Sequence, residues 1–155
     1  MAYQKLQVGR ALSVIPSDTV LIPDVSTEVL SSNGSFAVAN QLTGVGTTFK
    51  TTISSAGAIV YNNAYTVASK VTNVDSDTVL KLSGGSIGGA ADLYTIYNAP
   101  TTGCVLYVGV SGDLKVQTSS GDIVILKNLP VGFVPVQVIQ VFATGTTASE
   151  IIALW

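Results

Sequence analysis

The sequence has no histidine, one cysteine and few charged residues, and each scarcity narrows the possible functions. Histidine is the commonest general base and a frequent ligand of transition metals, so a chain without it has no Ser-His-Asp triad and no histidine-ligated zinc site. The single cysteine, Cys104, has no partner for a disulfide within the chain. It lies in the apolar run 104–108, which favours a small buried strand residue over a nucleophile.

Charged residues make up 10% of the chain, whereas an ordinary soluble domain carries about 25%. Uncharged polar side chains or a partner subunit must therefore cover the surface that Lys and Glu usually cover. Seven scattered cations and a net charge of −2 form no basic stripe, so we expect no nucleic-acid binding. We also expect no membrane association, because the sequence has no run of about 18 apolar residues. The N-terminal residues lack the pattern of a secretory signal, which predicts folding in the cytoplasm.

β-Branched residues and turns of Gly, Ser, Asp and Asn dominate the chain, and no window shows helical spacing of apolar residues. The sequence therefore predicts an all-β protein, an antiparallel β-sandwich or barrel with meander-like or jelly-roll-like topology. The clearest strands recur about every ten residues in the C-terminal third. They are expected at 104–110, 114–118, 123–126, 134–142 and 150–155. A meander is the simplest topology, and in it the first two of these strands form a hairpin.

A second set of strands is predicted in the middle of the chain, where it resembles a small module of its own. These strands are expected at 58–61, 65–74, 78–82 and 93–97, with polar connectors at 31–35 and 44–48. Nearer the N-terminus, Pro16 and Pro23 bracket the short extended piece 18–22. Prolines at both ends suit an edge strand or an arm.

The sequence contains only weak indications of catalytic, metal-binding or phosphate-binding groups. Most aspartates stand beside Gly or Ser, where a turn explains them, so the paired carboxylates of a hydrolase are not favoured. The segment 75–77 is similar to the start of a calcium loop but lacks the glycine and the glutamate of an EF-hand. The glycine-rich segment 84–89 lacks the lysine of a phosphate-binding loop and indicates a loop tip. We therefore expect no enzymatic activity, no metal and no cofactor.

The C-terminal segment, about residues 103–155, resembles the head-spike base proteins of gene transfer agents and of related tailed phages and prophages. The motifs that carry the resemblance fall in order at Gly103–Gly109, Gly112-Asp113, Ser120–Asp122, Asn128–Gly132, Pro135–Val138 and Phe142–Trp155. Residues 14–23 resemble the same family more weakly, and the middle is similar to a β module of marine phage structural proteins. The resemblance implies a parent β domain, residues 1–26 plus 103–155, with a second small β module inserted at 27–102.

This resemblance implies a virion structural protein on the capsid exterior, made in the host cytoplasm, as head decoration (cement) or as a vertex spike base. The low charge favours the same interpretation, because strand faces without charge suit contacts between subunits. We expect trimers or pentamers of the chain, which bind the major capsid protein or other virion proteins. The residues expected to make these assembly contacts are Tyr3, Leu6, Val8, Leu12, Phe133 and Trp155.

Two other functions stay open at this point. A tail, collar or baseplate protein would have the same composition and the same kind of strands. A carbohydrate-binding module for the host surface would need aromatic and carboxylate side chains gathered on one exposed set of loops.

Overall fold

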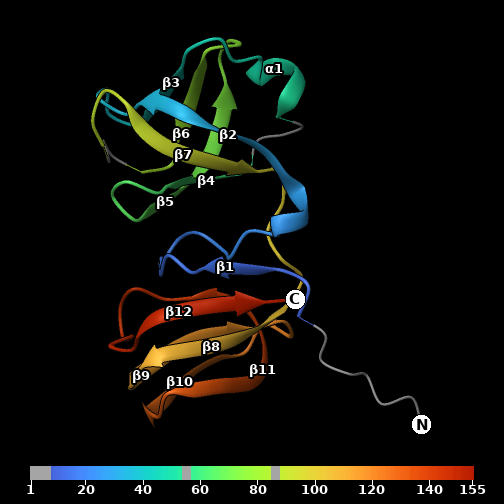
Figure 1. Cartoon of the computed structure of the whole chain (residues 1–155), viewed down its shortest axis with the longest axis vertical. Coiled ribbons are helices and arrows are strands. Elements are labelled where there is room, and N and C mark those ends of the chain that lie inside the picture. Colours follow the sequence, from blue (N-terminus) through green and yellow to red (C-terminus); the bar gives the residue numbers. More distant parts are fainter. Residues whose placement is uncertain (1–7, 54–56, 85–87) are drawn as a thin grey trace, which may run out of the picture.

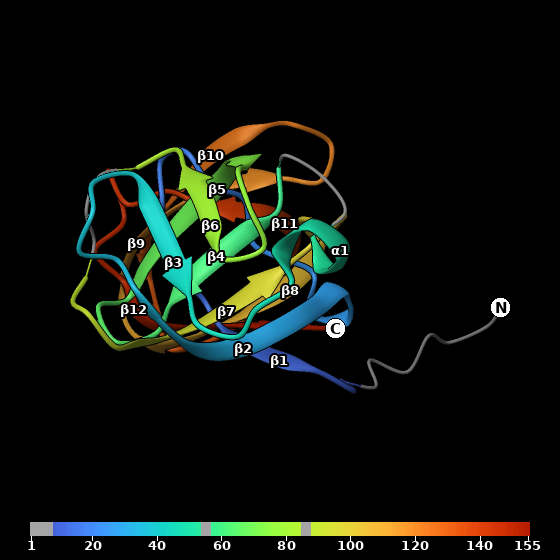
Figure 2. The same cartoon turned by 90° about the horizontal axis from the view of Figure 1, so that it is seen from above.

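The computed structural model describes residues 8–53, 57–84 and 88–155. The predicted all-β class is confirmed, because the chain forms a six-stranded antiparallel sheet and a closed six-stranded antiparallel barrel. The two are stacked along the long axis of the molecule, with the barrel at the top of Figure 1 and the sheet at the bottom. Viewed from above, the barrel overlies the sheet (Figure 2).

The six-stranded sheet contains the C-terminal part of the chain and one short strand from near the N-terminus. Its order is β1-β12-β8-β11-β9-β10. The strands are β1 (Ala11–Ser13), β8 (Cys104–Val110), β9 (Gly112–Thr118), β10 (Ile123–Leu129), β11 (Gly132–Val141) and β12 (Ser149–Leu154). The five strands from β8 onward lie where the ten-residue spacing predicted strands.

The order of these strands differs from the meander expected for them. β8 pairs with β12 and β11, whereas β9 pairs with β10 and β11, so the predicted hairpin of β8 and β9 is wrong. Only Ser111 separates β8 from β9, which is too short for the two-residue reversal of a tight hairpin. The chain instead continues into another part of the sheet, where the Asp113 carbonyl accepts the N–H groups of Thr147 and Ala148.

The barrel consists of the middle of the chain, in the order β2-β3-β6-β5-β4-β7. Its strands are β2 (Glu28–Ser35), β3 (Gln41–Gly44), β4 (Ile59–Asn62), β5 (Val67–Val74), β6 (Val79–Leu82) and β7 (Asp92–Tyr97). Two short helical turns, η1 (Val25–Thr27) and α1 (Phe49–Thr52), precede β2 and β4. The connector predicted at 31–35 is wrong, because these residues belong to β2. A Cβ on Gly34 would lie 2.7 Å from the Tyr94 ring, so glycine is needed for this close packing.

The extended piece predicted at 18–22 is not a strand. The Ser17 hydroxyl accepts the N–H groups of Thr19 and Val20, which turns the chain at this point. The segment then follows the end of β11, where the Ile22 N–H donates to the Ile139 carbonyl.

Three clusters of buried side chains hold the molecule together. One packs against the six-stranded sheet, with Leu106 and Val108 fully buried, and a second fills the barrel around Leu42 and Leu80. The third lies between sheet and barrel and contains Val20, Ile59, Tyr61 and Tyr97, with Leu12 packed against it. The rings of Tyr61 and Tyr97 meet edge to face, with centroids 5.8 Å apart. Burial raises the pKa of both phenols, so the two tyrosines are neutral packing residues.

Leu106→Ala is expected to lower the free energy of unfolding by about 2–5 kcal/mol, because it leaves a cavity under the central strand of the sheet. Urea denaturation followed by far-UV circular dichroism measures the change. Leu93→Ala, at an exposed position on β7, is the control and should change this free energy by less than about 0.5 kcal/mol. Equal losses for both variants would contradict the placement of the sheet core.

Candidate assembly surface

The outer face of the sheet carries a row of apolar side chains. The strand register places Ile152 of β12 and Phe133 of β11 on either side of Tyr107 of β8. Side chains alternate across a strand, and the neighbours of Tyr107 on β8, Leu106 and Val108, point into the buried core. The row of Ile152, Tyr107 and Phe133, called the apolar row below, therefore faces away from the core.

The apolar row is held in place before any partner binds. The rings of Tyr107 and Phe133 meet at 68° with centroids 5.3 Å apart, which is a favourable edge-to-face geometry. Phe133 is nevertheless 63% exposed, and Ile152 is also exposed. Val131, in the turn before β11, is a further exposed apolar side chain. Exposed aromatic and aliphatic groups that are already ordered are typical of contact surfaces between proteins.

The residues expected to make assembly contacts lie in different environments. Phe133 belongs to the apolar row, whereas Leu12 is partly buried against the sheet core and against the cluster below the barrel. Val8 is exposed, and Trp155 packs against the sheet core while its indole N–H donates to the Thr101 hydroxyl at 2.9 Å. Tyr3 and Leu6 lie outside the described residues.

The first and last described segments meet beside the sheet. The Gly9 N–H donates to the Trp155 carbonyl at 2.7 Å, and the Trp155 N–H donates to the Arg10 carbonyl at 3.0 Å. Val8 and Trp155 are therefore brought together, and Phe133 stands apart from them on the outer face of the sheet.

Sequence reasoning did not single out Tyr107 and Ile152. Burial alternates only over 106–109 and 150–153, and the sequence is apolar at most of these positions, so it carries no polar-apolar alternation that could have found them. The pairing of β8 with β12, which aligns the two residues, could not be read from the alternation alone.

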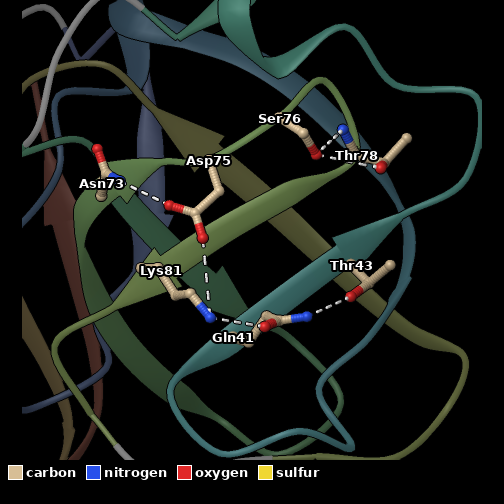
Figure 3. Close-up of polar contacts among 7 residues, drawn as sticks. All are labelled: Gln41, Thr43, Asn73, Asp75, Ser76, Thr78 and Lys81. Carbon is tan, nitrogen blue, oxygen red and sulfur yellow. Dashed lines mark hydrogen bonds and ion pairs between the residues drawn. The ribbon is translucent and has the colours of Figure 1, made fainter.

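A polar face on the barrel contrasts with the apolar row. The Lys81 ammonium donates to the Gln41 side-chain carbonyl at 2.9 Å, and the Gln41 amide donates to the Thr43 hydroxyl (Figure 3). The Asp75 carboxylate accepts the Asn73 amide at 2.6 Å and lies 3.8 Å from Lys81. These groups come from β3, from β6 and from the end of β5 with the turn that follows it. They give this part of the barrel a polar surface on which the charges of Lys81 and Asp75 offset one another.

The Asp92 carboxylate, at one end of the barrel, has a structural role. Asp92 is buried and accepts the Asn62 amide at 3.2 Å and the Gly89 N–H at 2.6 Å. These bonds fasten the loop before β7 to the end of β4. Tyr65 is exposed at the neighbouring turn, but the Asp92 carboxylate is engaged within the protein.

Cys104 is a buried strand residue. It is 1% exposed, its thiol donates to the Val138 carbonyl at 3.2 Å, and burial raises its pKa to about 12. The thiolate, which is the reactive form, is therefore nearly absent at neutral pH.

The described ranges contain no group of three or more His, Cys, Asp or Glu side chains that could hold a metal ion. Within those same ranges, no helix has the length and apolar character needed to cross a membrane. Comparison with protein-family models, curated proteins and solved structures finds no match to this chain.

Cys104 in the native protein is expected to resist an aromatic disulfide reagent at pH 8, because the thiol is buried and protonated. The absorbance of the released thiolate measures the reaction, and denaturant should restore full labelling. Rapid labelling of the native protein would contradict the burial of this strand.

Proposed function

We propose that this chain is a non-enzymatic structural protein of a phage virion, located on the capsid exterior as head decoration or as a vertex spike base. The observation that carries the proposal is the apolar row, which presents Phe133, Tyr107 and Ile152 on an outer sheet face. All three residues lie within 103–155, the segment that resembles head-spike base proteins. A virion location, a partner in the capsid and an oligomeric state are all parts of this proposal.

The proposed partner of the apolar row is a neighbouring copy of the chain. A row on one side of each subunit that meets a different surface of the next subunit generates a ring, as a trimer or a pentamer requires. Each fully buried apolar side chain contributes about 1.5–3 kcal/mol, and a ring repeats this contribution at every interface. Burial of Phe133 is expected to contribute the most free energy to this contact, because Phe133 is the most exposed aromatic side chain of the sheet.

The stacked arrangement supports a division of roles. Sheet and barrel lie at opposite ends of the long axis (Figure 1), so a sheet that is held by neighbouring copies and the major capsid protein leaves the barrel projecting outward. The polar network around Lys81 and Gln41 suits an exposed position, because its side chains already satisfy one another in water.

Purified protein is expected to form assemblies built on rings of three or five chains at micromolar concentration, and Phe133→Asp should abolish these rings, because a buried unpaired carboxylate opposes the contact. Mass photometry measures the distribution. Val45→Asp is the matched control, since Val45 is 87% exposed on a loop of the barrel and should leave the oligomer intact. A monomeric wild-type protein would contradict the assembly proposal, provided that circular dichroism shows a folded chain.

Antibody and gold labelling of intact particles is expected to mark the heads, because the proposed partner is the capsid. Labels on tails, collars or baseplates would overturn the head location and favour the second virion position. Unlabelled particles together with specific hits on a glycan array would overturn the virion role and favour a carbohydrate-binding module. Antibody bound to a soluble lysate fraction serves as the positive control for recognition.

A further inference from the structure

β10 is the last strand of the sheet, and its outer edge has no partner among the described residues. Natural proteins usually protect such an edge with lysine, proline or a bulge, because free N–H and C=O groups attract another strand. Here the edge runs through Ile123, Val124, Ile125 and Leu126 without lysine or proline. The first lysine, Lys127, is bound to the Asp113 carboxylate at 2.6 Å.

The hydrogen bonds of β9 show which backbone groups of β10 face outward. The Thr118 N–H donates to the Asp122 carbonyl, and the register then places Val124 opposite Val116. In an antiparallel pair every second residue exchanges hydrogen bonds with its partner. Val124 therefore bonds to β9, whereas Ile123 and Ile125 direct their N–H and C=O groups to the free edge.

The side chains of β10 show that the sheet core is open at this edge. Val124 and Leu126 lie opposite the fully buried Val116 and Leu114, so they belong to the core face. Val124 is still 37% exposed, because no strand covers it from the far side. One more strand with an apolar side chain opposite Val124 would complete this layer.

We propose that the missing strand is β10 of a second copy, paired antiparallel about a two-fold axis with Val124 opposite Val124. A two-fold contact requires a segment that complements itself. The run Ile123-Val124-Ile125 does so, because each isoleucine then lies opposite the other isoleucine of the second copy. The outward groups of Ile123 and Ile125 would exchange about four backbone hydrogen bonds between the copies.

The position of the Asp122 carboxylates and the short length of the open edge of β10 both favour this register. It places each Asp122 opposite a leucine, so the two carboxylates lie at opposite ends of the paired strands and do not repel one another. Beyond Leu126 the register with β9 shifts, and Asn128 adopts a left-handed conformation with φ of 50°. The open edge is therefore short, and it ends where a longer pairing would begin to meet Lys127.

This contact is separate from the ring proposed above and does not rest on the virion role. The apolar row lies on β12, β8 and β11, whereas the two-fold contact uses only the edge of β10. A two-fold contact makes dimers of free chains or joins rings in pairs. Loss of one contact therefore leaves the other measurable.

Cysteine cross-linking tests the pairing residue by residue. Val124→Cys is expected to form a disulfide-linked dimer on mild oxidation, because opposite residues of this kind of pair have Cα atoms about 4.5 Å apart. Ile125→Cys alone should remain mostly uncross-linked. A mixture of Ile123→Cys and Ile125→Cys chains with different tags should give the mixed dimer. Non-reducing gel electrophoresis measures each product, and wild-type protein with its buried Cys104 is the background control.

A second variant tests the contact without a disulfide. Ile125→Pro removes an N–H that faces the free edge, so pairing with β9 persists and pairing with a second copy is lost. Light scattering after size-exclusion chromatography should show the apparent mass halved relative to wild type, with an unchanged circular dichroism spectrum. Phe133→Asp should leave the Val124→Cys cross-link intact. Cross-linking of Ile125→Cys but not of Val124→Cys, or a wild-type mass that Ile125→Pro leaves unchanged, would overturn the proposal.

Discussion

The central position of β8 is the constraint on which the rest of the molecule depends. β8 pairs with β12 on one side and with β11 on the other, so its alternation of side chains sets the character of both faces of the sheet. Leu106 and Val108 supply the centre of the core, and Tyr107 between them supplies the centre of the apolar row. One strand therefore stabilises the fold and presents the apolar row, and a one-residue change of register in β8 would exchange the two faces.

The scarcity of charge has two different structural meanings. On the barrel, amide and hydroxyl groups take positions where charges would usually stand and bind one another, as the contact of Gln41 with Thr43 illustrates. On the sheet, exposed apolar side chains on β10, β11 and β12 occupy positions where charges would normally stand. Composition alone could not separate these cases, because it does not record which face of a strand a residue occupies.

Local signals were enough to locate most strands but not to order them. The turns around Gly121 and Gly145 punctuate the C-terminal third, so the strands between them were predicted within a few residues. The pairing of β8 with β12 links residues far apart in the sequence, and no local turn specifies it. The same limit hid the apolar row, since Ile152 and Tyr107 become neighbours only through that pairing. Phe133 was among the residues expected to make assembly contacts, and that expectation stays a prediction.

The two segments that join sheet and barrel run side by side. Pro23 pairs with Pro100 through an isolated bridge, and the Asp24 N–H donates to the Ala99 carbonyl at 3.0 Å. The chain leaves the sheet and returns to it at adjacent points. The residues between these two points therefore do not have to span a distance across the sheet. The buried cluster of Val20, Ile59, Tyr61 and Tyr97 is the other tie between the two parts, so a barrel of different size would have to keep this cluster and the bridge between Pro23 and Pro100.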